Sequence, residues 1–285
     1  MRQFILSAIA VGATIATAAP VMAADMPEPP PVYSPPPEME VEVGGWYLRG
    51  DVGFTNQAAD TFYSDYWTVG SNVFVGSEPE FSPSYFIGAG FGYQFNAWFR
   101  SDATIEYRAK SDFDGSDTYT NATPQTGGNF YDTDKTELVG LLNIYADLGT
   151  WGGLTPFIGA GIGFATIMMG ELTDTGYNYQ SGRTPELITS VATAESSSTT
   201  NFAWALMAGF GYQVAPGVTA EVAYRYLDMG SAETGALDIN GTDYTVVVKD
   251  ITSQDVRFGL RWAMDGGAEM DPDPQPIAYE PIITK

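Results

Sequence analysis

Apolar and polar residues alternate with a period of two in eight segments of this 285-residue chain. A period of two is typical of a β-strand whose two faces meet different surroundings. Strands of soluble domains are usually about five or six residues long, whereas a tilted strand that crosses a bilayer needs about nine to eleven. Each segment is long enough to cross: 46–55, 85–95, 98–109, 136–149, 156–167, 202–215, 218–228 and 254–264.

The connections between these predicted strands are alternately short and long. Short turns are expected at Asn96-Ala97, from Thr150 to Leu154 and at Pro216-Gly217. Loops of more than about 15 residues are uncommon in compact domains unless they have a function. The pattern predicts short turns and both chain termini at one end of the sheet, and four long loops at the other end, at residues 56–84, 110–135, 168–201 and 229–253.

The two faces of the predicted strands differ in composition. In the stretch FIGAGFGYQF (86–95), three glycines and Gln94 share one face, while large apolar residues occupy the other. Most of the other strands carry aromatic and aliphatic residues on one face and charged residues on the opposite face. Two architectures fit this alternation: a soluble barrel with an apolar interior, and a membrane barrel with a polar lumen.

The choice of cation favours the membrane barrel. Every basic residue on the charged face is arginine, whereas Lys110, Lys135 and Lys249 are expected in loops or at strand ends. A closed interior favours arginine, because the planar guanidinium group pairs with several carboxylates and is weakly hydrated. A sheet in hydrocarbon also has to close, since an open edge would leave backbone groups unpaired. We therefore predict an all-β fold, an eight-stranded antiparallel up-and-down transmembrane β-barrel.

A network of ion pairs is expected to fill the lumen of this barrel. Six arginines and seven carboxylates lie on the charged faces, and charges removed from water need partners. We expect the substitution Arg225→Leu to impair folding by leaving Glu221 or another carboxylate unpaired. The predicted lumen residues are Arg49, Asp51, Arg100, Asp102, Glu106, Arg108, Glu137, Asp147, Glu221, Arg225, Asp255, Arg257 and Arg261.

A weak internal repeat relates two of the predicted hairpins. Residues 91–95 and Asp102 recur as residues 210–214 and Glu221, at a constant offset of 119 positions. The repeat implies that the second and third strands do the same job as the sixth and seventh.

The two ends of the chain differ from the alternating region. Residues 1–23 have the positive start, apolar core and small-residue cleavage site of a signal peptide. Residues 24–44 are rich in proline and glutamate and predict an extended periplasmic linker. Residues 265–285 predict a second, acidic periplasmic tail, so the predicted barrel domain covers residues 45–264.

Charge and residue types argue against several functions. The net charge of −23 makes nucleic acid an unfavourable partner. The chain has no histidine and no cysteine, so the commonest general base and the thiolate metal ligand are both missing. The stretch from Asp112 to Asp117 departs from a calcium loop, which needs glycine at its sixth position, and GAGFG lacks the dinucleotide spacing. We predict no enzymatic activity, no cofactor and no dedicated metal site.

Five short segments stand in the order and spacing of a known family: GGWYLRGDVGF (44–54), FIGAGFGYQFN (86–96), TPFIGAGIGFA (155–165), VAYRYLD (222–228) and VRFGLRW (256–262). They resemble the small outer-membrane β-barrel proteins of Gram-negative bacteria, including the OmpA-type transmembrane domain and the opacity-like surface antigens of the porin family. The resemblance implies an outer-membrane location, insertion by the barrel-assembly machinery and a structural or surface-interaction role. Members usually end the barrel on an aromatic residue, whereas Trp262 is followed by some twenty residues.

Three roles remain open for such a barrel. It could be a structural, surface-exposed protein, a channel for small solutes, or an adhesin that acts through its loops. The four long loops hold 17 of the 35 acidic residues, so an acidic outer surface is expected. The expected partners are outer-membrane lipid and lipopolysaccharide, the insertion machinery, and a host or cell-surface ligand of the loops.

Overall fold

The computed structural model describes residues 44–68, 73–77, 80–120, 126–179, 187–239 and 242–264. The predicted signal peptide (1–23), the predicted linker up to residue 43 and the predicted tail (265–285) lie outside the described residues. No helix among the described residues is long and apolar enough to cross a membrane.

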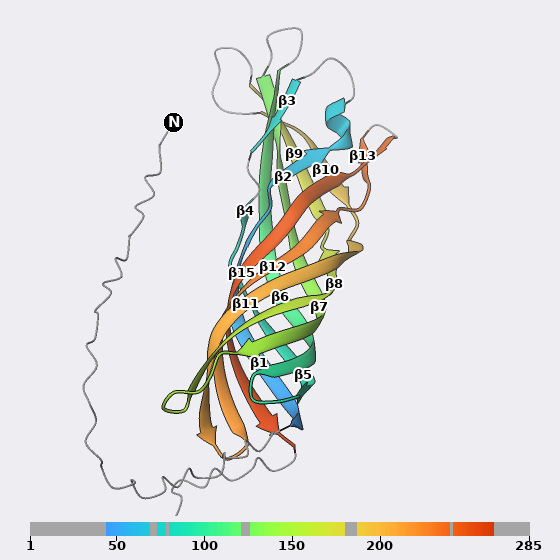
Figure 1. Cartoon of the computed structure of the whole chain (residues 1–285). Helices are drawn as coiled ribbons and strands as arrows, with labels where there is room; N and C mark the ends of the chain where they lie inside the picture. Colours follow the sequence, from blue (N-terminus) through green and yellow to red (C-terminus); the bar gives the residue numbers. More distant parts are fainter. Residues whose placement is uncertain are drawn as a thin grey trace, which may run out of the picture. The chain divides into compact units, whose positions relative to one another are not determined.

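Eight long antiparallel strands form a closed barrel (Figure 1). Each strand pairs with the next one along this series, and the last strand pairs with the first, which closes the ring. The prediction of an eight-stranded antiparallel barrel is confirmed. In chain order the strands are β1 (Gly45–Ala58), β5 (Ser84–Gln94), β6 (Phe99–Thr120), β7 (Thr126–Asp147), β8 (Leu154–Met169), β11 (Ser197–Ala215), β12 (Val218–Glu233) and β15 (Val246–Ala263).

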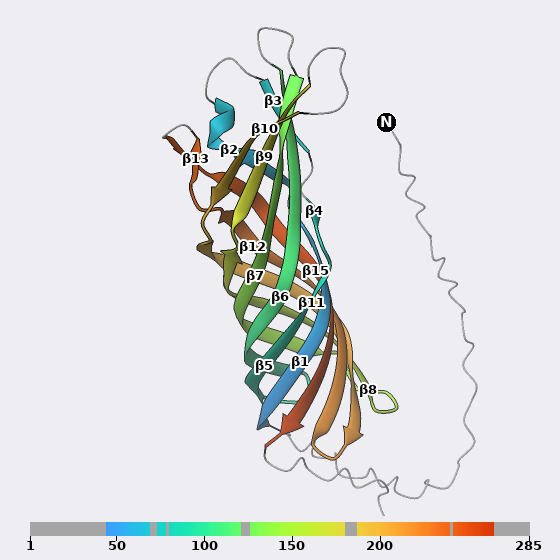
Figure 2. The ribbon, with the colours of Figure 1, turned by 180° about the vertical axis from the view of Figure 1, so that it is seen from behind.

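The prediction of four long loops is wrong over much of their length. Residues 110–120 continue β6, residues 126–135 continue β7, and the two segments pair with each other along most of their length. Shorter elements occupy the other three segments: β2 (Thr61–Ser64), the 3-10 helix η1 (Asp65–Thr68), β3 (Val73–Gly76), β4 (Glu80–Phe81), β9 (Leu172–Tyr179), β10 (Leu187–Ala194), β13 (Leu237–Ile239) and β14 (Thr242–Tyr244). We call the described residues of 56–84, 110–135, 168–201 and 229–253 the extension; both ribbon views show its short strands gathered at the end of the barrel away from the short turns (Figures 1 and 2).

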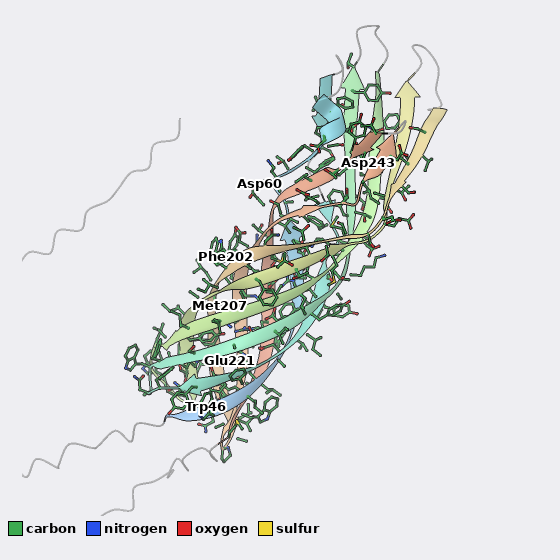
Figure 3. All side chains as sticks on the ribbon, turned by 90° about the vertical axis from the view of Figure 1, so that its right-hand side faces the viewer. Trp46, Asp60, Phe202, Met207, Glu221 and Asp243 are labelled. Atoms are coloured by element: carbon green, nitrogen blue, oxygen red, sulfur yellow. The ribbon has the colours of Figure 1, made fainter. Side chains whose placement is uncertain are left out.

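The outward face of the barrel changes from apolar to polar at one level. Below that level it is covered by exposed aromatic and aliphatic side chains, from Trp46 near the short turns to Phe202 (Figure 3). Above it stands a polar ring, in which the hydroxyl groups of Thr166 and Thr200 are hydrogen-bonded at 2.9 Å. An apolar belt bounded by polar residues is the surface that lipid requires. The polar ring consists of Asn56, Thr136, Thr166, Thr200, Asp228 and Gln254.

The inward face carries the charged residues. On β1, for example, Arg49 and Asp51 are buried while their neighbours Leu48 and Val52 are exposed. The alternation therefore has the orientation of a membrane barrel, with apolar side chains on the outside and charged side chains inside.

Candidate functional site: the barrel lumen

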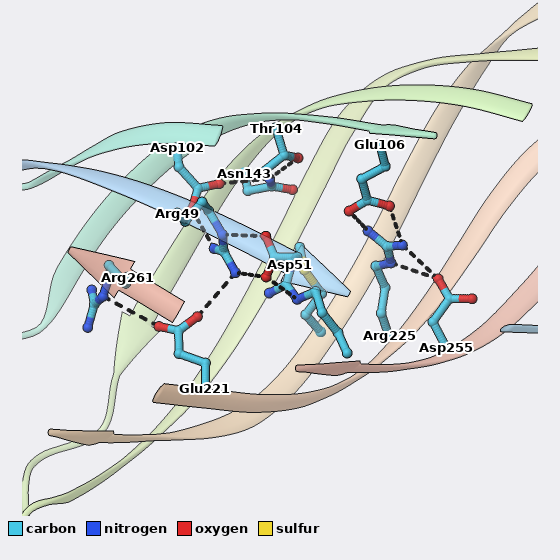
Figure 4. A network of polar contacts seen from close by, with 12 residues as sticks. Arg49, Asp51, Asp102, Thr104, Glu106, Asn143, Glu221, Arg225, Asp255 and Arg261 are labelled. Atoms are coloured by element: carbon cyan, nitrogen blue, oxygen red, sulfur yellow. Dashed lines mark hydrogen bonds and ion pairs between the residues drawn. The ribbon is translucent and has the colours of Figure 1, made fainter. Parts of the chain in front are cut away.

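The thirteen predicted lumen residues come from five strands: β1, β6, β7, β12 and β15. The structure brings all thirteen into ion pairs with one another or with a neighbouring lysine. All are buried except Arg261, whose side chain is 16% exposed. They form two groups along the barrel, with no ion pair or hydrogen bond recorded between them (Figure 4).

The first group is organised by Arg49 on β1. Its guanidinium group donates to both carboxylate oxygens of Asp51 at 2.8 Å, to Asp102 on β6 at 2.6 Å and to Glu221 on β12 at 3.2 Å. Asp102 also accepts from the hydroxyl group of Tyr47 at 3.1 Å and from the amide of Asn143 at 2.8 Å. Arg49 thus links strands β1, β6 and β12, and the planar guanidinium group of arginine suits contacts with several carboxylates.

Glu221 extends the first group toward the short turns. It pairs with Arg100 on β6 at 3.2 Å and with Arg261 on β15 at 3.5 Å. Arg100 also pairs with Asp147 at 3.1 Å, and its guanidinium group lies 4.1 Å from the ring centroid of Tyr145. The sequence interpretation gave Glu221 as a candidate partner of Arg225, but the structure pairs Glu221 with Arg49, Arg100 and Arg261.

The second group is centred on Arg225 of β12. Its two terminal nitrogens donate to the two carboxylate oxygens of Glu106, each at 2.6 Å, and it also donates to Asp255 at 2.7 Å. Arg108 on β6 holds the other oxygen of Asp255 at 2.8 Å and pairs with Glu137 at 2.9 Å. Bidentate contacts of this kind are the strongest of the charge-assisted hydrogen bonds.

Lys135 belongs to the second group, and its assignment to a loop or strand end is wrong. It lies within β7, is fully buried, and its ammonium group contacts the side chains of Glu137 and Gln57. With Lys135 included, seven cationic side chains meet seven carboxylates in the two groups, which makes them neutral in sum. A balance of charge is what low-dielectric surroundings require.

The internal repeat has a structural meaning. The two repeated hairpins, β5–β6 and β11–β12, stand on opposite walls, because two strands separate them in each direction round the ring: β7 and β8 on one side, β15 and β1 on the other. Glu106 and Arg225, which are 119 positions apart, meet across the lumen. The second pair of equivalent positions, Asp102 and Glu221, is held by the single guanidinium group of Arg49. The repeat therefore supplies both sides of these two contacts across the lumen.

The lumen is not charged on every wall. The inward residues of β7, β8 and β11 near the second group are small or apolar and belong to the buried hydrophobic cluster. Small residues on one wall leave room for long arginine side chains that reach from the other. This apolar wall consists of Val139, Leu141, Ala165, Ile167, Ala203 and Ala205.

Glycine on β5 serves the same purpose. A Cβ atom on Gly90 would lie 2.6 Å from the carbonyl oxygen of Ala103 and 3.1 Å from Cγ of Arg49. We expect Gly90→Val to destabilise the barrel by about 1–3 kcal/mol through overpacking, measured as a shift in the urea midpoint of unfolding in detergent. Ala89→Val places the same valine side chain on the exposed outward face and is the matched control; an equal shift in both variants would contradict the packing argument.

The lumen network is not hydrogen-bonded at every atom, because the two terminal nitrogens of Arg257 are buried without a hydrogen-bond partner among the described residues. Its carboxylates are engaged by arginine or lysine, and no group of three or more Asp or Glu side chains among the described residues is arranged to hold a metal ion. The arrangement can therefore fix the strands relative to one another and obstruct the lumen.

A closed ring of eight tilted strands, an apolar outer belt and a charged lumen define a transmembrane β-barrel. Residues 9–250 match the family described as the outer membrane protein beta-barrel domain, and the chain belongs to this family. Its location is therefore the outer membrane of a Gram-negative bacterium.

Curated relatives cover most of the chain. A Brucella abortus protein is 26% identical over 257 residues, which span 84% of this chain and 86% of that protein. A Rickettsia bellii protein named "Putative adhesin" is 31% identical over 201 residues, spanning 69% of this chain and 77% of that protein. A Rickettsia felis protein with the same name is 28% identical over 224 residues, 78% and 89% of the two chains.

Solved structures with a similar fold are small outer-membrane barrels. The outer membrane protein OprG of Pseudomonas aeruginosa matches with a TM-score of 0.45 and 14% identity, over 78% of this chain and 97% of that one. Neisserial surface protein A matches with a TM-score of 0.37 and 14% identity, over 77% and 97% of the two chains.

Proposed function

We propose that this outer-membrane barrel is a sealed structural protein that makes contacts at the cell surface through its extension, and that it is not a solute channel. The observation that carries the proposal is the continuation of the sheet beyond the polar ring, above a lumen that is filled with side chains. In this arrangement the membrane-embedded part of the barrel anchors the protein, and the extension presents a surface for contacts outside the membrane.

The lumen argues against a pore. An eight-stranded barrel has an interior just wide enough for side chains to fill it. Here the arginines at positions 49, 100, 108 and 225 are all buried, and each is held by carboxylates from at least one other strand. Moving a solute past them would require several buried ion pairs to break together, which is costly.

The extension offers an acidic surface. On its outward face, Asp112 of β6 stands opposite Asp134 of β7, and Asp114 stands opposite Asp132. Lys110 lies 3.5 Å from Asp112 and 3.3 Å from Asp134. Like charges directly opposite one another weaken a sheet, so this face gains from a cationic neighbour. Basic patches on another cell or protein are the contacts that it favours, and divalent cations could bridge it to lipopolysaccharide.

An adhesin role is the specific form of this proposal that the relatives favour. The names of the Rickettsia proteins contain the word adhesin, and their similarity spans most of this chain. We place the extension outside the cell and the short turns in the periplasm, with residues 24–44 and 265–285 on the periplasmic side after removal of residues 1–23. Insertion by the barrel-assembly machinery and contact with lipopolysaccharide are parts of the same proposal.

Conductance distinguishes the sealed barrel from a channel. We expect the folded protein in planar bilayers to show no steady openings, because the network occupies the lumen. A wide porin in the same bilayers is the positive control, and heat-dependent gel migration confirms that the reconstituted protein is folded. Steady openings whose conductance changes in the Arg100→Ala or Arg257→Ala variant would contradict the proposal and favour the channel.

A further inference from the structure

Two carboxylates lie close together on the inward face of the extension. Asp117 is on β6 and Asp174 on β9, on either side of β7. Tyr131 of β7 connects them, because its backbone pairs with Asp174 and its hydroxyl group donates to Asp117 at 2.7 Å. All three residues are buried, and none belongs to the lumen network.

The carboxylate of Asp117 accepts hydrogen bonds from several protein groups. It accepts from the indole nitrogen of Trp67 at 2.8 Å, from the hydroxyl group of Tyr131 at 2.7 Å, and from the side-chain and backbone nitrogens of Asn129 at 3.0–3.1 Å. Both oxygens of Asp117 therefore already have hydrogen-bond donors.

Asp174 has the opposite surroundings. It is only 7% exposed, and its Oδ1 atom has no hydrogen-bond partner among the described residues. Burial first, and then the charge of Asp117, raise the pKa of Asp174 to about 7. The same two causes raise the pKa of the Tyr131 hydroxyl group, so tyrosine stays neutral at this site.

The arrangement of groups round Asp174 favours binding of a proton over binding of a metal ion. Both oxygens of Asp117 are occupied by N–H and O–H donors, so they have no lone pairs free for a cation. The described residues hold no third carboxylate, histidine or cysteine within reach of the pair. A single remaining carboxylate is a poor site for calcium, which takes about six to eight oxygen ligands.

We propose that Asp174 is a proton-operated latch that controls the docking of the β9–β10 hairpin on β7. The hairpin is attached to β7 through the pairing of residues 173–179 with residues 126–132. The ionisable groups that face Asp174 are Asp117 from β6 and Tyr131 from β7; η1 contributes the neutral Trp67, and β10 places Ala192 opposite. The described residues place no cationic group against Asp174, so its ionisation leaves two buried carboxylate charges of the same sign beside each other.

The direction of the effect follows from proton linkage. The docked hairpin holds the proton of Asp174 up to a pH of about 7, whereas an undocked aspartate releases it near the ordinary aspartate pKa of 3.8. The docked state therefore binds more protons between these values, and docking is strongest in acid and weakens as the pH rises toward 7. The consequence for surface contacts rests on the proposed function: the contact surface is best ordered in an acidic environment.

Hydrogen exchange tests the latch without reference to adhesion. In the full-length protein in detergent, we expect the protection factors of β9 and β10 amides to fall about tenfold or more between pH 5 and pH 8, since one pKa unit corresponds to a factor of ten. Amides of β1 and β12 within the apolar belt should keep their protection factors over the same pH range. Asp174→Asn mimics the protonated side chain and should keep the hairpin protected at both pH values.

The matched control is Asp132→Asn, which removes an exposed carboxylate from the β7 segment that pairs with β9. It should retain the full pH dependence. The latch is overturned if the unaltered protein shows equal protection at pH 5 and pH 8, or if Asp174→Asn keeps the pH dependence. Recovery of protection at pH 8 on addition of calcium chloride would also overturn it, because a cation would then be the ligand. A protein that fails to adhere but shows the latch would refute only the proposed function.

Discussion

Replacing Arg225 by leucine should destabilise the folded barrel by about 3–5 kcal/mol, the cost of leaving a buried charge without its partner. Glu106 loses both of its 2.6 Å contacts, and no other ion pair to it is recorded. Asp255 is less affected because Arg108 still holds it at 2.8 Å. The loss of stability therefore comes mainly from one carboxylate left without an ion-pair partner, that of Glu106, rather than from Glu221.

A second substitution separates the stranded charge from the lost packing. The double variant Arg225→Leu and Glu106→Leu removes both charges and should recover most of the stability, because apolar replacement of a complete buried pair is often nearly neutral. Urea unfolding followed by the heat-dependent gel shift gives the midpoints. Lys110→Leu removes an exposed cation from two surface ion pairs and should lower the midpoint far less than Arg225→Leu, because exposed ion pairs contribute only about 0–1 kcal/mol. Equal midpoints for the single and double variants would show that packing, not charge, accounts for the loss.

The alternation within the belt made the eight strands predictable from the sequence. Along β1, Trp46, Leu48, Val52 and Phe54 mark a face that meets lipid, while Arg49 and its neighbours mark the lumen. The contrast between hydrocarbon and a packed polar interior is large, so each strand carries a strong period of two.

The same contrast disappears above the polar ring, which is why the extension was taken for loops. On β6, Asp112 and Asp114 point outward to water while Phe113 is buried, and the inward set that follows is mixed, with Gly115 and Asp117. Because the inward apolar residues are few and alternate with Gly115 and Asp117, the sequence of this stretch resembles that of a loop. Besides the pairing of β6 with β7, ring contacts of Phe113 and Tyr131 with Phe62 hold these strands to the rest of the extension.

The partners within the lumen could not be read from the sequence either. The alternation on one strand shows which charged residues point into the lumen, but it does not show which strand carries their ion-pair partners. Those partners depend on how the eight strands are arranged round the closed barrel. Glu106 and Arg225 illustrate this: they are 119 positions apart and meet at 2.6 Å. Lys135 was missed for another reason, because its position beside the polar ring gave no sign that β7 continues and carries it into the interior.

Removing the β9–β10 hairpin should abolish surface contact while the barrel still folds. Met169 at the end of β8 pairs directly with Ser197 at the start of β11, so residues 170–196 can be replaced by an Asn-Gly turn, which suits a two-residue hairpin. All pairs from Ser197–Met169 to Tyr212–Leu154 remain available. The apolar belt and both ion-pair groups also remain, because none of their residues lies in the deleted segment.

Adherence of bacteria that display the two forms on their surface measures the effect. Bacteria with the shortened barrel should bind a cultured epithelial monolayer no better than bacteria without the protein, since the sheet β7–β9–β10 is lost from the extension. The gel shift on heating should persist, which shows that the anchor is folded. Trp151→Ala changes an exposed residue among the short turns and should leave adherence unaltered. Undiminished adherence by the shortened form would assign the contact to the rest of the extension, whereas an equal loss with Trp151→Ala would place it at the opposite end of the barrel and overturn the proposed orientation.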